Sequence, residues 1–142
     1  MSGSASSAVA DAWLSRGADE LVRVRRDLHS HPELGNEEHR TTRLLVDRLA
    51  LAGLAPTVLE GGTGLVCDVG EGGPVVVLRA DIDALPLQDE KLVPYRSTVD
   101  GVCHACGHDV HTAALVGAAL VLAQRHAHVK HPGLPGPAGR GG

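Results

Sequence analysis

The segment that most constrains the fold of this chain is residues 111–124, a helical stretch that is apolar nearly all the way round. Leu, Val and Ala occupy almost every position from Ala113 to Leu122, and no charged side chain interrupts them. A helix without a polar face is stable only where other elements cover it on more than one side. The sequence therefore predicts a helix buried within a larger, layered domain.

Three short runs of β type come before this helix and predict neighbouring strands of one sheet. Residues 57–60, 65–69 and 75–79 are separated by glycine-rich turns. The last run, Val-Val-Val-Leu, is apolar on both faces, as is typical of a central strand that helices cover on both sides. A covered strand of this kind indicates an α/β domain.

Two further helices are expected at residues 8–30 and 37–52, the first ended by Pro32 and the second capped by Gly53. Outside the domain at residues 8–124, both ends of the chain lack any periodic pattern. Residues 1–7 are small and polar, and residues 125–142 are rich in Gly, Pro, His and Arg. We expect both ends to be disordered, because they bury too little apolar surface to offset the entropy of ordering.

Composition excludes several classes of partner. The formal net charge is -4 with acids and bases interspersed, so there is no basic stripe for nucleic acid and no polybasic patch for a membrane surface. No apolar run approaches the roughly 20 residues that span a bilayer, and no leader-like segment opens the chain. We therefore expect a cytoplasmic protein that binds neither nucleic acid nor membrane.

A cluster of potential metal ligands lies within residues 103–111, directly before the apolar helix. Thiolate and imidazole are the donors that zinc prefers and that related divalent ions accept. In an extended segment Cys106 and His108 point to the same side, and Gly107 between them lets the backbone turn closely around an ion. The pattern is compatible with a metal site and equally with a Cys- and His-rich turn that has a buried thiol and a helix-capping Asp109.

Two acids, Asp81 and Asp83, follow the expected central strand at its carboxyl end. Open α/β sheets bind their ligands outside the carboxyl ends of the strands, so acids at this place suggest a site. The pair could bind a metal, orient a metal-bound imidazole, or act as catalytic acid and base. Spacing alone favours the simpler alternative, a solvated strand exit whose Asp caps a turn.

Other histidines carry weaker signals. His29 and His31 end the first expected helix, where the helix dipole alone accounts for them, and we favour a structural role. His126, His128 and His131 lie in the tail that we expect to be disordered, and we assign no site to them.

Three stretches stand out together: RRDLHSHPELGNEE at residues 25–38, VVLRADIDALPLQDE at residues 76–90 and GVCHACGHDVHTAALVGAA at residues 101–119. In this order and spacing they resemble the M20 peptidase family, in its branch of hippurate hydrolases, N-acyl-amino-acid deacylases and indole-acetyl-amino-acid hydrolases. The resemblance covers residues 18–124. Three ordered motifs make it far more specific than a single pattern match.

The resemblance implies a partial three-layer α/β/α zinc-peptidase-like catalytic domain, truncated relative to the family. It also implies a dinuclear zinc or manganese site, and cleavage of the amide bond of an N-acyl amino acid or small peptide. The family's Cys-Gly-His-Asp motif places two metal ligands on Cys106 and His108. Its strand-end acids correspond to Asp83, as the acid that orients a ligand, and to Asp81 as the lesser candidate.

The match departs from the family pattern in two ways. Cys103 occupies a position where this branch usually has Met, which adds a thiol near Cys106. Beyond residue 124 the match stops: no acid follows Asp109, and the family's catalytic Glu pair, its further His and Glu ligands and its dimerisation domain are absent. We therefore expect negligible amidase activity from this chain alone, and we hypothesise that its tail arises from a frameshift or truncation of the gene.

Two alternatives stay open beside an enzyme fragment. The cluster at residues 103–108 could form a closed structural zinc site with a tail histidine, which would make the chain a small metal-binding or interaction module. Alternatively, the chain could be unstable, because a sheet cut short exposes apolar surface and an unpaired edge. Bound zinc that stabilises the fold would separate the first alternative from an enzyme fragment.

Overall fold

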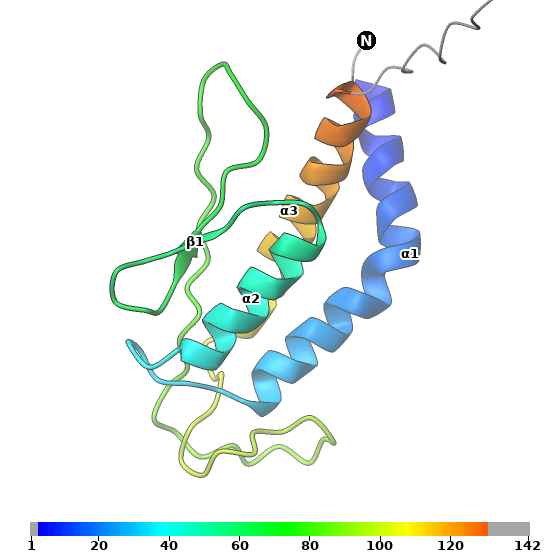
Figure 1. The fold of residues 1–142 in the computed structure, drawn as a ribbon. Coiled ribbons are helices and arrows are strands. Elements are labelled where there is room, and N and C mark those ends of the chain that lie inside the picture. Colours follow the sequence, from blue (N-terminus) through cyan, green and yellow to red (C-terminus); the bar gives the residue numbers. More distant parts are fainter. Residues whose placement is uncertain (1–2, 131–142) are drawn as a thin grey trace, which may run out of the picture.

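The computed structural model describes residues 3–130, which form three helices and one small sheet. In chain order the elements are α1 (Gly3–Ser30), α2 (His39–Leu51), β1 (Thr57–Val58), β2 (Leu65–Val66) and α3 (His108–Lys130). The helices pack side by side, the sheet and the loops next to it lie along one flank of them, and the loop that leads into α3 lies at the lower end of the helices (Figure 1). The helix layer is therefore the body of the molecule, and the sheet lies at its margin.

The first helix is longer than the sequence predicts. α1 begins at Gly3 and runs without interruption through Gly17 to Ser30. The helix predicted at residues 8–30 is confirmed, whereas the prediction that residues 3–7 are disordered is wrong, because they extend α1 at its start. Once a helix has formed, each further residue adds a backbone hydrogen bond without a new nucleation step, so α1 can extend through this segment although only one of its five residues is Ala.

The second helix matches the one predicted at residues 37–52, and both of its ends have a physical cause. The Glu33 carboxylate accepts hydrogen bonds from the backbone N–H groups of Arg40 and Thr41 at 2.8 and 2.7 Å. It thereby satisfies N–H groups that lack partners within α2, at the end where the helix dipole favours a negative charge. At the other end Gly53 takes a positive φ of 78°, a conformation that glycine adopts readily and that stops a helix.

The core lies between α1 and α3, where Val24, Leu28 and Ala113 form one buried cluster. The two helices approach closely at Gly117. A β-carbon built there would lie 2.7 Å from a methyl carbon of Leu21, so a larger residue would push the helices apart. The glycine therefore permits the close contact that covers one side of α3.

α3 extends beyond the helix predicted at residues 111–124 at both ends. It includes residues 125–130, so the prediction of a disordered tail is wrong for that part, and residues 131–142 lie outside the described residues. The six added residues contain neither Gly nor Pro, so nothing in them stops the helix. The described residues do not cover α3 completely, since Val110 and Leu122 on this helix are 49 and 44% exposed.

β1 and β2 pair antiparallel, in a register that places Thr57 opposite Val66. This confirms that the runs predicted at residues 57–60 and 65–69 are neighbouring strands, although the paired parts are shorter. No other named strands pair within residues 3–130.

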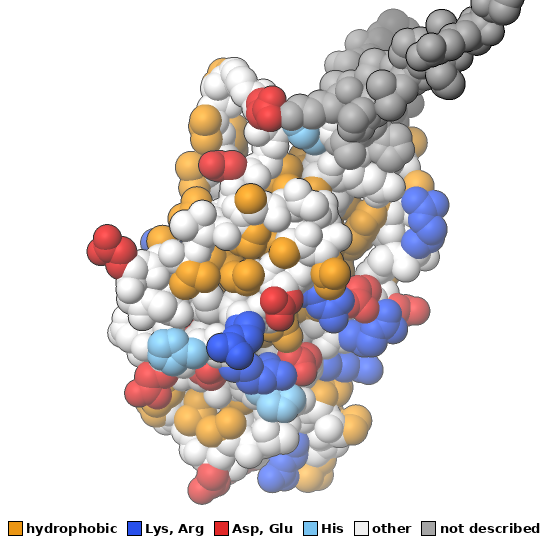
Figure 2. Space-filling model, in the orientation of Figure 1, with side chains coloured by type: hydrophobic (Ala, Val, Ile, Leu, Met, Phe, Trp, Pro, Cys, Tyr) orange, Lys and Arg blue, Asp and Glu red, His pale blue; other side chains and the backbone are white. Residues whose placement is uncertain are grey.

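The prediction of a covered central strand at residues 75–79 is wrong for this structure. The segment pairs with no strand of the described part of the chain, and Val75, Val76 and Val77 are 83, 82 and 83% exposed. Hydrophobic side chains gather along this outer edge of the molecule (Figure 2). A strand is buried only when other strands and a helix supply its neighbours, and residues 3–130 supply none on this flank.

Helices beside a small sheet make the arrangement part of an α/β fold, with its helices on one side of the sheet (Figure 1). The positions of the helices bring the end of α1, the loops before α3 and the start of α3 together. Within residues 3–130, no helix combines the length and the apolar character that crossing a membrane requires. The expected cytoplasmic location stays a prediction.

Candidate metal centre

The turn that carries Cys106 and His108 is fixed by backbone contacts on both sides. Before it, Cys103 and Leu85 exchange two N–H···O=C hydrogen bonds of 3.0 Å, an isolated antiparallel bridge that ties the turn to an earlier loop. After it, Gly107 takes a positive φ of 83°, and its carbonyl accepts hydrogen bonds from two N–H groups in the first turn of α3. The backbone therefore bends into α3 at the glycine, the residue type best able to adopt this conformation.

One ring nitrogen of His108 is held by Asp83. Nδ1 of His108 lies 3.0 Å from Oδ1 of Asp83 and 3.0 Å from the backbone carbonyl oxygen of the same residue. Both oxygens are acceptors, so Nδ1 carries a hydrogen, and in the neutral ring Nε2 then keeps the lone pair. Histidine ligands of metals are commonly oriented in this way, with a carboxylate or carbonyl on one nitrogen and the ion on the other.

Cys106, two residues before His108, presents an exposed thiol, whereas Cys103 is buried. A thiolate and an imidazole nitrogen are a donor pair that fits a divalent ion such as zinc. Within residues 3–130, no group of three or more His, Cys, Asp or Glu side chains is arranged to hold a metal. The two donors therefore fit part of a metal site and do not complete one.

The closed four-ligand zinc site of the alternative interpretation is not assembled by the described residues either. It needs a histidine of the tail beside the cysteines, and the side chains of His128 and His131 lie outside the described residues. No observation favours this alternative over a partial centre.

Asp81 is engaged by Arg79 and makes no hydrogen bond to His108. Arg79 donates two hydrogen bonds to Oδ1 of Asp81, from Nε at 3.1 Å and from Nη2 at 2.8 Å. These bonds and the guanidinium charge lower the pKa of the Asp81 carboxyl below its ordinary value, which makes it a weak proton acceptor. Of the two acids singled out in the sequence, Asp83 is the one that contacts the candidate ligand.

A buried polar cluster lies beside the turn, around the fully buried His29 at the end of α1. His29 Nδ1 donates a hydrogen bond of 2.7 Å to Oδ2 of Asp109, and Nε of Arg25 lies 2.8 Å from the same oxygen. On the other side of the ring, His29 Nε2 lies 3.4 Å from Oδ2 of Asp89. The Asp109 carboxylate therefore joins α3 to α1, and it accepts no capping hydrogen bond from the backbone N–H groups of α3.

Three hydrogen bonds stabilise the carboxylate of Asp89, the third charged side chain of this cluster. It accepts hydrogen bonds from the N–H of Ser97 at 2.9 Å and from the N–H and the ammonium group of Lys91 at 3.1 Å each. The Ser97 bond above all, with the two from Lys91, holds the pKa of Asp89 well below the usual carboxyl range against the opposing effect of burial. Burial also lowers the pKa of His104, whose ring nitrogens have no partner among the described residues.

The burial of His29 agrees with the structural role that we favoured for it, but sequence reasoning missed Arg25 and Asp89. Arg25 and His29 are four residues apart and share one face of α1, so their spacing was a usable signal. Asp89 carries no such signal, because only the tertiary fold returns its loop to His29. His31 directly follows α1, and its Nδ1 lies 2.9 Å from the carbonyl oxygen of Asp27 on that helix.

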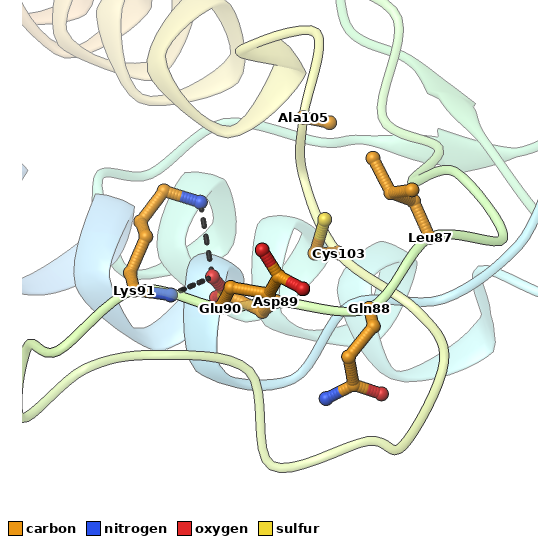
Figure 3. A pocket seen from close by; sticks show the side chains of 7 residues that line it. All are labelled: Leu87, Gln88, Asp89, Glu90, Lys91, Cys103 and Ala105. Atoms are coloured by element: carbon orange, nitrogen blue, oxygen red, sulfur yellow. Dashed lines mark hydrogen bonds and ion pairs between the residues drawn. The ribbon is translucent and has the colours of Figure 1, made fainter.

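An open pocket of about 480 Å³ lies next to the turn, between it and the loop at residues 87–91 (Figure 3). Cys103 and Ala105 come from the turn, and the loop supplies the other side chains that line the pocket: Leu87, Gln88, Asp89, Glu90 and Lys91. The ammonium group of Lys91 donates a hydrogen bond to the carboxylate of Asp89 on one side of the pocket (Figure 3). A small molecule can therefore approach the turn from this side.

Comparison with known proteins identifies similar chains. The model of peptidase family M20/M25/M40 matches residues 77–135. An N-acetylcysteine deacetylase of Bacillus subtilis is 44% identical over 115 residues, and a Rhodococcus jostii protein provisionally named glutamate–cysteine ligase 2-3 is 57% identical over 104 residues. Among solved structures, the YXEP protein of Bacillus subtilis, a dinuclear metal-binding peptidase from the M20 family, matches with a TM-score of 0.73 at 45% identity.

These matches cover most of this chain and a minor part of each relative. The deacetylase match covers 78% of this chain and 30% of that protein, and the YXEP match covers 78 and 32%. The Rhodococcus match covers 72% of this chain and 13% of that protein, so the name of that protein says little about the shared part. The chain thus spans about a third or less of the relatives that it matches.

Proposed function

Because this chain belongs to peptidase family M20/M25/M40 and corresponds to the N-terminal part of the proteins of that family, we propose that it carries part of the metal centre of an amidohydrolase. In this proposal Cys106 and His108 are ligands of a divalent ion, zinc or manganese. The proposed substrate class of the complete enzyme is an N-acyl amino acid or a small peptide, in line with the name of the deacetylase relative.

The observation that carries the proposal is the contact between His108 and Asp83. Two acceptor oxygens of Asp83 lie 3.0 Å from Nδ1 of His108, which leaves Nε2 as the donor for an ion. The exposed thiol of Cys106 precedes it by two residues, on a turn whose backbone is tied down at both ends. A soft sulfur donor and an oriented imidazole on one turn support a zinc-type site.

The two acids have separate roles in this proposal. Asp83 is the residue that orients the ligand histidine, because it contacts His108 directly. Asp81 is the lesser candidate for any catalytic role, since Arg79 holds it in its ionised form.

An ion bound at this turn would polarise the amide carbonyl and lower the pKa of a bound water, which is the chemistry that amide hydrolysis requires. The residues of this chain would bind the ion and orient the imidazole. Hydrolysis also needs a carboxylate that delivers a proton to the leaving nitrogen, and no acid follows Asp109 in the sequence. We therefore expect negligible hydrolysis of N-acyl amino acids by this chain alone.

Metal titration tests the assignment of the two ligands. We expect zinc or manganese, titrated separately by calorimetry, to bind the full chain, and we expect Cys106→Ser and His108→Gln each to lose most of that affinity. Cys67→Ser and His39→Gln are matched controls, because these residues lie outside the turn, and they should bind like the unchanged protein. Binding that persists in both ligand variants would contradict the proposal.

A second measurement separates the proposal from its alternatives. Incubation of the purified chain with N-acetylcysteine and either ion should release no acetate above the control without protein. A metal-dependent rate would refute the expected inactivity. A chain that holds zinc in a one-to-one ratio and unfolds when the zinc is chelated would point instead to a structural zinc module.

A further inference from the structure

We propose that His29 and Asp109 are positioning residues of the candidate metal centre, and that they hold His108 in place before any ion binds. The inference rests on the proposed role of His108 as a ligand. It adds two residues that touch neither the ion nor the substrate and that act on the centre through His108.

The turn itself lacks packing at the point where it bends. A β-carbon built at Gly107 would meet no atom within 4 Å, so side-chain packing does not hold the backbone there. Asp109 is the residue directly after His108, in the first turn of α3. Its carboxylate accepts the 2.7 Å hydrogen bond from Nδ1 of His29 and so anchors this end of the turn to α1.

Burial makes this anchor rigid. The side chains of His29, Asp109 and Asp89 are completely shielded from solvent. The imidazole of His29 lies between two carboxylates, with Nδ1 2.7 Å from Asp109 and Nε2 3.4 Å from Asp89. Only the contact with Asp109 is a hydrogen bond, so that bond sets the orientation of the ring. A move of the Asp109 carboxylate into water would leave Nδ1 of the buried His29 without its hydrogen-bond acceptor, so the pair is held in this arrangement.

Two contacts of different kinds therefore hold His108. Asp83 orients the ring through Nδ1, whereas Asp109 holds the backbone from which the ring projects. The contact between the His108 ring and Asp83 depends on the anchor at Asp109, because the ring reaches Asp83 only if the backbone of His108 is held in place. Loss of the His29–Asp109 bond should consequently free the ring of His108 from Asp83.

The first test needs no metal. Long-range proton–nitrogen NMR spectra of the full chain with isotope-labelled histidine report which ring nitrogen of His108 carries hydrogen, at a pH where imidazoles are neutral. We expect the Nδ1–H form in the unchanged protein. In Asp109→Asn, which keeps the shape of the side chain, and in His29→Gln, we expect a mixture of the two forms.

Controls separate positioning from general stability. Asp47→Asn removes an exposed carboxylate of α2, and Leu49→Val weakens the core at a buried position of α2. Both should keep the Nδ1–H form of His108, and His108→Gln identifies its signal by removing it. If Asp109→Asn does not fold, His29→Gln decides the test.

The second readout is the binding of cobalt(II), whose absorption spectrum responds to a thiolate ligand and to the geometry of the site. We expect Asp109→Asn and His29→Gln each to weaken cobalt affinity by about 10- to 100-fold, the usual effect of removing a residue that orients a ligand. The double variant should lose no more than either single variant, because both substitutions break the same contact.

The outcomes distinguish this inference from the proposed function. An unchanged His108 signal in both variants overturns the positioning role, whatever the cobalt affinity. A loss of cobalt affinity of equal size in Leu49→Val also overturns it, because stability alone would then account for the effect. If the signal changes as expected but the unchanged protein binds no cobalt, the positioning role stands and the proposed metal centre fails.

Discussion

The junction of α1 with α3 and the segment at residues 75–78 differ in how far their physical requirements are met. At the junction, polar side chains from separate stretches contact one another in the interior: Nδ1 of the fully buried His29 is hydrogen-bonded to Asp109, although Nε2 of the same ring makes no hydrogen bond. At residues 75–78, consecutive apolar side chains are 58 to 83% exposed, and no strand of residues 3–130 pairs with them. The main contacts of the junction are therefore formed within the described residues, whereas the segment at residues 75–78 finds no strand partner there.

The difference reflects how many neighbours each kind of element needs. A buried ion pair is satisfied by a few side chains at hydrogen-bond distance, which two helices and one loop can supply. A central strand needs partners along both edges and a helix over each face. A chain that spans 32% of a related solved structure can assemble the first kind of contact without assembling the second.

The largest effect should come from breaking the junction. Asp109→Ala removes the carboxylate that His29 and Arg25 share, and leaves the buried His29 without its hydrogen-bond acceptor and the partly buried Arg25 without this anion. We expect the free energy of unfolding to fall by about 3–5 kcal/mol, as is usual when one member of a buried ion pair is removed. Urea denaturation measures the change. Asp47→Ala, at an exposed position, should stay within about 0.5 kcal/mol of the unchanged protein, and equal losses would refute the role of the junction.

A comparison of two apolar residues contrasts the two regions directly. Leu28 is 1% exposed and Val76 is 82% exposed. Leu28→Ala should lower the free energy of unfolding by about 2–5 kcal/mol, because it leaves a cavity in the core. Val76→Ala should change it by less than about 0.5 kcal/mol, as expected at an open surface. A large loss at Val76, again measured in urea, would show that the segment is covered in solution.

The pH dependence of Asp89 sharpens the account of the junction. Asp89→Asn should cost about 2 kcal/mol at neutral pH, because hydrogen bonds to a charged acceptor are lost. Since the pKa of Asp89 is lowered in the folded protein, its stabilising effect is complete above the ordinary carboxyl pKa of about 3.9 and is lost as the pH falls through the folded value. The difference between variant and unchanged protein should therefore be constant above about pH 5 and shrink below about pH 4. A difference that grows on acidification would contradict this.

The smallest effect on stability is expected at residues 75–78, where self-association is the quantity to measure. Val76→Lys should leave the free energy of unfolding within about 0.5 kcal/mol and should reduce self-association, because a charge on an unpaired strand disfavours pairing with a second copy. Sedimentation velocity at increasing concentration measures the association. Val22→Lys places the same charge on α1 at a residue that is 45% exposed and should not reduce association. Equal behaviour of the two variants would mean that the segment takes no part in it.

Local signals predicted much of the fold. Gly53 marks the end of α2, and Gly107 marks the bend before α3, because both positions need a positive φ that glycine tolerates. The hydrophobic patterns located all three helices and the pair β1–β2. The prediction of a covered strand at residues 75–79 was wrong. An apolar pattern indicates that a strand needs to be covered, but the neighbouring strands and helices that would cover it must come from elsewhere in the chain. The cap on α2 was also missed, since Glu33 acts from outside the helix.

The sequence by itself determined where the helices lie, that a thiol and an imidazole share one turn at Cys106 and His108, and that two acids precede them. These properties depend on residues a few positions apart, within reach of local backbone preferences and periodicity. Only the tertiary structure decided that Asp83 contacts His108 whereas Arg79 holds Asp81, and that His29 lies between two carboxylates. Most of these contacts join residues far apart in the chain, and their geometry depends on how the helices and loops pack, which no local pattern encodes.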